Sequence, residues 1–175
     1  MQVIANVLKE ARWIKNAGHS YACLMIPVPY KLKQHIQDIG NSIDKEILSG
    51  NGLEKFTHIT FLYGLQNDDG EKIKVDGPIE IQNKPVIEYF DNKDSGQSVA
   101  IVKIESKDLE KKHYELKSSI PNEDSFPEYI PHITIAYLKY GERLPSDIKV
   151  PVVKWKANDF IFGEKNESQK FLKMI

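Results

Sequence analysis

Hydrophobic residues recur along the chain in two patterns, one typical of helices and one typical of buried strands. Apolar side chains spaced three or four residues apart predict amphipathic helices over about 4–14, 30–48 and 108–118. A polar stretch at 66–78 is expected to be a loop. Short apolar runs bounded by Gly, Pro or polar turn residues predict strands at 20–27, 57–63, 79–81, 86–90, 98–105, 129–138, 150–153 and 158–162.

The order of these expected elements repeats once. A strand beginning at Ser20, a helix and a strand that contains His58-Ile-Thr-Phe form a first unit over about 18–65. A strand beginning at Ser98, a helix and a strand that contains His132-Ile-Thr-Ile form a second unit over about 96–140. The histidine follows the strand start by 38 residues in the first unit and by 34 in the second. The repeat predicts one α+β domain over residues 1–175, with two pseudo-symmetric lobes and a central cleft.

Each unit carries a His-x-Thr motif, at 58–60 and at 132–134. The chain has only three threonines and five histidines, so chance does not easily explain two such motifs at equivalent places of the repeat. Because side chains alternate along a strand, the His and Thr of each motif are expected to share one face. On the same alternation, the opposite face, toward the core of each lobe, is expected to carry Ile59, Phe61, Tyr63, Ile133, Ile135 and Tyr137.

Two imidazoles and two hydroxyls facing one another suit the cleavage of a phosphodiester. One imidazole of His58 and His132 would act as general base and the other, protonated, as general acid. The hydroxyls of Thr60 and Thr134 would donate to the non-bridging phosphate oxygens. A single His beside a Thr in a strand is more often structural, but the paired occurrence favours catalysis. No Cys or carboxylate lies at motif spacing to complete a zinc site, so neither a metal nor a cofactor is expected.

These motifs, His58-Ile-Thr-Phe and His132-Ile-Thr-Ile, resemble those of the 2H phosphoesterase superfamily. Three stretches, 18–24, 57–65 and 129–138, resemble more narrowly the phage anti-CBASS nucleases, 2H enzymes that linearise cyclic di- and trinucleotide immune signals. The resemblance implies antiparallel sheets around the cleft and a metal-free active site. It also implies which residues form that site: His58, Thr60, His132 and Thr134.

Recognition of a nucleotide base requires flat side chains or hydrogen-bonding groups near the cleft. A carboxylate in the turn after Phe162, Glu164, could accept hydrogen bonds from a base edge, although such residues are more often solvated. Most aromatic residues on strands belong to the core, and Tyr63 and Tyr137 are expected on the wrong face. The candidates for stacking on a base are Trp13, Tyr21, Phe90, Tyr129 and Trp155.

The composition of the chain excludes some classes of binding partner. The formal net charge of −1 argues against coating long nucleic acid, which needs excess Lys and Arg. The longest uncharged apolar stretch, 21–30, is about half of what a membrane helix needs, so no membrane partner is expected. A single cysteine, Cys23, excludes an internal disulfide. The expected location is the cytoplasm, that of an infected bacterium if a phage encodes the chain.

The sequence therefore predicts a metal-independent phosphodiesterase that cleaves 3′-5′ bonds of a small cyclic oligonucleotide. One alternative is a 2H enzyme acting on RNA ends, 2′,3′-cyclic phosphates or 2′-5′ oligonucleotides. Another is a non-catalytic sponge for cyclic nucleotides. The sequence does not distinguish which histidine is the base, whether a 2′,3′-cyclic phosphate forms first, or the oligomeric state.

Overall fold

The computed structural model describes residues 21–166 and 168–175, so the expected helix at 4–14 lies outside the described residues. The described elements, in chain order, are β1 (Ala22–Pro27), α2 (Tyr30–Ser42), the 3-10 helix η1 (Lys45–Ile47), β2 (Leu48–Leu53), β3 (His58–Leu65), the 3-10 helix η2 (Asn67–Glu71), β4 (Ile79–Asn92), β5 (Gln97–Glu105), α3 (Lys107–Ser119), β6 (His132–Lys139), β7 (Lys154–Ala157), β8 (Asp159–Gly163) and β9 (Gln169–Lys173).

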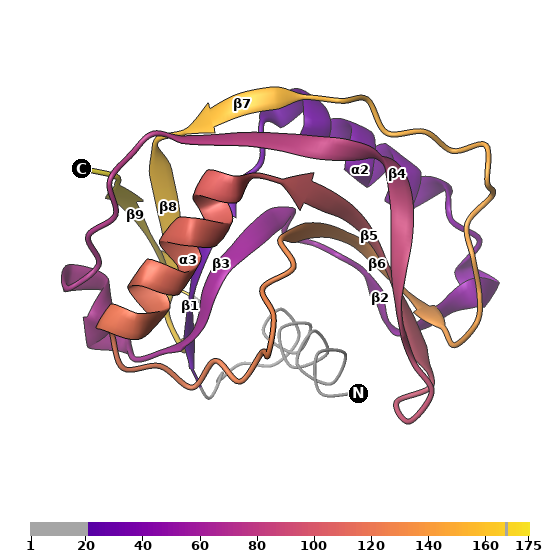
Figure 1. Cartoon of the computed structure of the whole chain (residues 1–175). Helices are drawn as coiled ribbons and strands as arrows, with labels where there is room; N and C mark the ends of the chain where they lie inside the picture. The colour runs from indigo at the N-terminus through magenta and orange to yellow at the C-terminus, as the bar shows by residue number, and fades with distance from the viewer. Residues whose placement is uncertain (1–20, 167) are drawn as a thin grey trace.

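All described strands join one antiparallel sheet, which curls into an arch (Figure 1). The strand order is β7-β4-β5-β6-β3-β1-β8-β9, and β2 pairs with β6 beside this path. The two repeat units meet where β3 lies next to β6, through the pair Ile59 and Ile133. On moving outward from this junction, β1 and then β8 follow β3 on one side, and β5 and then β4 follow β6 on the other. A pseudo-two-fold axis at the junction therefore relates β1 to β5 and β8 to β4. The fold is α+β, as the repeat predicted.

Helices α2 and α3 pack against one face of the sheet. The main core cluster combines α2 residues such as Leu32 and Ile36 with α3 residues such as Leu109 and with strand residues of both units. Helix α2 belongs to the first unit but contacts β6 of the second, whereas α3 contacts β4 and also β3 of the first. Each helix therefore helps to bury the strands of the other unit, and one core serves both.

Local sequence explains where the helices begin and end. The Ser106 hydroxyl accepts a hydrogen bond from the Leu109 N–H and so caps the start of α3. Helix α2 ends at Ser42, earlier than the expected 48, because residues 48–53 pair with β6 instead. Gly40 faces β2 and β6, where an added Cβ would make ordinary contacts, 3.7 Å from Leu53 and 3.9 Å from the Ile135 carbonyl oxygen.

Several expected strand boundaries were wrong. The runs 79–81 and 86–90 are parts of one long strand, β4, whose pairing with β5 is irregular between Asn83 and Ile87. Residues 150–153 form no strand, and β7 begins at Lys154. Strand β9 was not expected, because its polar sequence QKFLK lacks an apolar run. In the part of the chain that the structure describes, no helix has the length and apolar character of a membrane span.

Candidate active site

The two His-x-Thr motifs begin the two central strands of the sheet. His58 and Thr60 lie at the start of β3, and His132 and Thr134 at the start of β6. Ile59 is paired with Ile133, so the same antiparallel register places His58 opposite Thr134 and Thr60 opposite His132. Residues directly opposite in such a ladder have Cβ atoms about 5 Å apart, and diagonal neighbours are about 7–8 Å apart. The register therefore gathers all four side chains on one face.

Both imidazoles are oriented by a backbone carbonyl two residues earlier. The Nδ1 of His58 lies 2.6 Å from the Phe56 carbonyl oxygen, and the Nδ1 of His132 lies 2.7 Å from the Ile130 carbonyl oxygen. A carbonyl oxygen only accepts hydrogen bonds, so Nδ1 carries the proton in both rings. The catalytically useful nitrogen is then Nε2, and that of His58 lies 3.3 Å from the Thr60 hydroxyl oxygen.

Burial disfavours the charged form of both rings. Desolvation lowers the pKa of His58 to about 4, against a smaller upward effect of its bond to Phe56. A charge on His132 lowers the pKa of His58 further, because like charges repel across the site. Desolvation also lowers the pKa of His132 below its usual value of 6.5. In the free protein, burial therefore favours the neutral, basic form of both imidazoles.

A bulge in each central strand changes which residues face the cleft. In β3, Met25 pairs with Thr60 and Leu24 with Leu62, which leaves Phe61 as an extra residue. In β6, Ile101 pairs with Thr134 and Ala100 with Ala136, which leaves Ile135 as an extra residue.

The extra residue shifts the alternation, so the expected position of Tyr63 and Tyr137 on the core face was wrong. Tyr63 packs with Cys23 and Met25, and Tyr137 packs with Val99 and Ile101, in two clusters separate from the main core. Both tyrosines share a face with the threonines, as their strand partners show. No residue in the sequence marks a bulge here, and the strict alternation of an unbroken strand led to the error.

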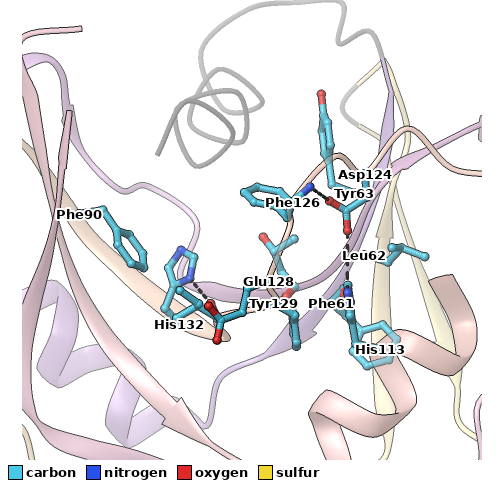
Figure 2. Close-up of a pocket in the computed structure, with 12 residues that line it drawn as sticks. Phe61, Leu62, Tyr63, Phe90, His113, Asp124, Phe126, Glu128, Tyr129 and His132 are labelled. Carbon is cyan, nitrogen blue, oxygen red and sulfur yellow. Dashed lines mark hydrogen bonds and ion pairs between the residues drawn. The ribbon is translucent and has the colours of Figure 1, made fainter. Parts of the chain in front are cut away.

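Aromatic rings surround the two histidines. Phe56 stacks on His58 with ring centroids 5.4 Å apart, and Phe90 meets His132 edge-on at 5.1 Å. Figure 2 shows Phe90 and His132 on one side of the pocket and Phe126 with Tyr63 on the other. Of the expected base contacts, Phe90 lines this pocket, and Tyr21 lies next to a lining residue, with its ring edge-on to that of Tyr63 at 5.8 Å.

Phe56 was not recognised from the sequence, although its place two residues before the first motif histidine could have suggested it. The second motif has Ile130 at that place, so the repeat itself gave no support for an aromatic ring there.

Two of the other four expected base contacts, Trp155 and Glu164, do not face the cleft. Trp13 lies outside the described residues. Trp155 pairs with Ile81 and packs against the main core, on the face opposite the cleft. Glu164 follows Gly163, which pairs with cleft-facing Cys23, so Glu164 is directed to the other face. There Glu164 forms an ion pair with Lys170 and accepts a hydrogen bond from the Ser168 hydroxyl.

Tyr129 lines the pocket but has a different environment from the one expected of a base platform. Its ring lies flat on that of His113, with centroids 3.8 Å apart and planes 5° apart. Its hydroxyl donates a hydrogen bond of 2.8 Å to the Thr60 carbonyl oxygen. The residue therefore contacts the backbone of the first motif directly.

A lysine that sequence reasoning overlooked lies beside the second motif. Lys103 pairs with His132 across β5 and β6 and so shares its face. Its ammonium group forms an ion pair of 2.5 Å with Glu88, and about a third of each side chain is exposed. Among the described residues, no group of three or more His, Cys, Asp or Glu is arranged to hold a metal ion.

Comparison with known proteins finds a family whose model matches most of the chain. Residues 32–158 match the family described as "Anti-CBASS protein Acb1". A comparison with curated proteins finds no match.

Three solved structures share the fold. TT0787 of Thermus thermophilus aligns with a TM-score of 0.53 at 14% identity, over 89% of this chain and 95% of that one. E. coli LigT complexed with 3′-AMP gives 0.51 at 11% identity, over 89% and 95%. Usb1 of Kluyveromyces marxianus gives 0.51 at 8% identity, over 88% and 97%. At these identities the likeness shows the fold.

Proposed function

Since the chain belongs to the anti-CBASS Acb1 family and is a phosphodiesterase of the 2H type, we propose that it cleaves a 3′-5′ phosphodiester bond of a cyclic di- or trinucleotide. The observation that carries this proposal is the set of four side chains on one face, two imidazoles and two hydroxyls from adjacent strands. In the proposal, His58, Thr60, His132 and Thr134 are the catalytic residues.

In the proposed mechanism His58 is the general base and His132 the general acid. The positive charge of a protonated His132 lowers the pKa of His58, so in this proposal His58 is the neutral ring and His132 keeps the single shared proton. The Nε2 of His58 takes the proton from the attacking oxygen as that oxygen bonds to phosphorus. The bond between phosphorus and the leaving O5′ then breaks, and the Nε2 of His132 gives its proton to that oxygen.

The threonines stabilise the charge that builds up on the phosphate. Thr134 lies opposite His58 and Thr60 opposite His132, so each hydroxyl would approach one non-bridging oxygen of a phosphate placed between the imidazoles. Hydroxyl donors already in place at the developing charge lower the barrier without further rearrangement. This arrangement uses every polar group of the two motifs.

We further propose that the bases of the substrate stack on aromatic rings around the histidines. Phe90 beside His132 and Tyr21 beside Tyr63 lie on opposite sides of the junction between the two units. A stacked base typically contributes about 1–3 kcal/mol of binding free energy. Two such contacts suit a ligand with two or three bases better than they suit a single mononucleotide.

The experiment that tests the function is chromatography of 3′3′-cyclic di-AMP and its 2′-deoxy analogue after incubation with the protein. The wild type should convert the ribose form to a linear product, and His58→Ala should lower the rate by at least about 100-fold. His35→Ala is the matched control, because His35 is on α2 and its imidazole contacts the Lys149 carbonyl oxygen, away from the cleft.

The fate of the 2′-deoxy analogue shows whether the 2′-hydroxyl or water attacks the phosphorus. If the 2′-hydroxyl attacks, the 2′-deoxy analogue stays intact and a 2′,3′-cyclic phosphate accumulates from the ribose form. If water attacks, both compounds are cleaved. Parallel incubations with 2′-5′ oligoadenylate and with RNA ending in a 2′,3′-cyclic phosphate test the RNA-processing alternative. Binding of the cyclic dinucleotide without any linear product would refute catalysis in favour of a sponge.

A further inference from the structure

The bulge of β3 exposes two successive backbone carbonyls, and side chains from outside the sheet bind both. The Tyr129 hydroxyl donates to the Thr60 carbonyl oxygen at 2.8 Å. The Nδ1–H of His113 donates to the carbonyl oxygen of Phe61, the extra residue of the bulge, at 2.6 Å. The backbone that presents Thr60 to the cleft is therefore held at two adjacent points.

The two donors are themselves rigidly placed. The His113 side chain is buried, and its ring stacks on that of Tyr129 at 3.8 Å. The Tyr129 N–H donates to the Tyr114 hydroxyl at 3.0 Å, which ties the loop before β6 to α3. Asp124 of the same loop lies 3.9 Å from the Nε2 of His113 and 3.3 Å from the Lys117 ammonium group (Figure 2 shows Asp124 and His113).

The matching bulge of β6 is held differently. There the carbonyl oxygen of the extra residue, Ile135, accepts a hydrogen bond of 3.1 Å from the Glu54 backbone N–H. The β6 bulge is thus anchored by backbone next to β2, which pairs with β6, whereas the β3 bulge is anchored by side chains. A substitution of either donor can therefore loosen the first motif without changing any of the four proposed catalytic side chains.

We infer that His113 and Tyr129 are positioning residues for phosphodiester cleavage, acting through the β3 bulge on Thr60. This inference rests on the proposed role of Thr60. Loss of either hydrogen bond lets the bulge shift, and a displacement of about 1 Å at a catalytic group can cost up to about 100-fold in rate. The bonds do not touch the base-binding rings, so substrate affinity should change much less than turnover.

The test is a set of variants assayed on 3′3′-cyclic di-AMP at a temperature where each is fully folded by circular dichroism. Tyr129→Phe removes only the hydroxyl, and His113→Leu removes the ring donor. Both should lower kcat about tenfold or more with KM within threefold of the wild type. His113→Asn should recover most of kcat, because the Asn side-chain N–H₂ occupies the place of Nδ1 and can donate to the same Phe61 carbonyl.

A double-mutant cycle separates positioning from general weakening. In a Thr60→Val background, Tyr129→Phe should change kcat by less than twofold, since the hydroxyl that it positions is already gone. The matched control is Tyr89→Phe, which removes a similar bond, between the Leu144 N–H and the Tyr89 hydroxyl at 3.0 Å, on the core face. It should lower the melting temperature and leave kcat unchanged.

The outcomes are distinguishable. If Thr60→Val lowers kcat but Tyr129→Phe and His113→Leu do not, the inference is wrong and the proposed site stands. If Tyr129→Phe lowers kcat by the same factor with and without Thr60, the effect does not pass through Thr60 and the inference is also wrong. If Thr60→Val has no effect on kcat, the proposed role of Thr60 fails and the inference fails with it.

Discussion

The two imidazoles of the cleft have matching orientations but unequal basicity. Each has its Nδ1–H fixed on the carbonyl of the residue two positions earlier, so each offers Nε2 to the substrate. Their residue types and spacing were predictable from the sequence, because a His-x-Thr pair on any strand shares a face. Their difference in pKa was not, since it depends on burial and on the distance between two strands that are far apart in the chain.

This inequality predicts the pH dependence of catalysis. In the free enzyme, His58 must be neutral, which holds above about pH 4, and His132 must be protonated, which holds below a pKa lower than 6.5. A plot of kcat/KM against pH should therefore be bell-shaped with its maximum between about pH 4 and 6.5. The bound anionic phosphate stabilises both protonated rings, so the kcat profile should lie at higher pH. A kcat/KM that stays constant from pH 5 to 8 would contradict this pairing.

A second titratable residue, Glu54, should affect stability instead of turnover. Burial raises the pKa of Glu54 from 4.5 to about 7, although its carboxylate accepts bonds from the Phe56 N–H and the Tyr137 hydroxyl. The folded state thus binds this proton more tightly than the unfolded state, so stability contributed by Glu54 is full below pH 4.5 and is lost as pH rises through 7.

Replacing Glu54 by Gln should remove this loss while keeping an acceptor for the Phe56 N–H. The free energy of unfolding of Glu54→Gln relative to the wild type should rise by about 3 kcal/mol between pH 4.5 and pH 8. Urea denaturation at several pH values measures the difference. Glu46→Gln on the exposed 3-10 helix is the control and should show no such trend. A constant difference across this range would mean that Glu54 is not protonated preferentially in the folded state.

At the scale of elements, the sequence predicted the strands and helices whose apolar spacing is regular. Strands β1, β3, β5 and β6 and helices α2 and α3 follow from that spacing. Strand β9 and the continuity of β4 could not be foreseen, because edge strands and irregular pairing are stabilised by partners and not by local pattern. The bulges belong to the same class, and they explain why Tyr63 and Tyr137 were assigned to the wrong face.

The contact between β3 and the loop before β6 depends on a glycine. Gly64 has φ +84°, and a Cβ there would lie 2.6 Å from the Glu123 backbone nitrogen and 2.7 Å from that of Asp124. Gly64→Ala should destabilise the protein by about 2–5 kcal/mol, from left-handed strain and overpacking together. Gly96→Ala is the control, because Gly96 has φ +67° but no atom near its Cβ position, so only about 1–2 kcal/mol is expected. If urea denaturation gave the same decrease in the free energy of unfolding for both variants, the loop at Glu123 and Asp124 would be able to move away from the added methyl group at little cost.

At the scale of the molecule, the duplication gives a symmetric site but not two independent lobes. The repeat predicted two pseudo-symmetric units about a cleft, and the strands follow that plan. It could not predict that the sheet is continuous or that α2 packs against β6 while α3 reaches β3, because long-range contacts leave no mark on the local pattern. As a result, each unit contributes one histidine and one threonine to the site, and neither unit buries its own apolar face alone.

The shared core predicts that residues 1–175 unfold as one cooperative domain. Ile26 is fully buried on β1 of the first unit, so Ile26→Val should cost about 0.5–1.5 kcal/mol. Trp155 is on β7, at the edge of the sheet on the side of the second unit, and Trp13→Phe makes it the sole tryptophan reporter. In that background Ile26→Val should lower the urea midpoint of Trp155 fluorescence and of far-ultraviolet circular dichroism equally. If the fluorescence midpoint stayed fixed while the dichroism midpoint fell, the two units would be separate folding domains and the cleft a contact between them.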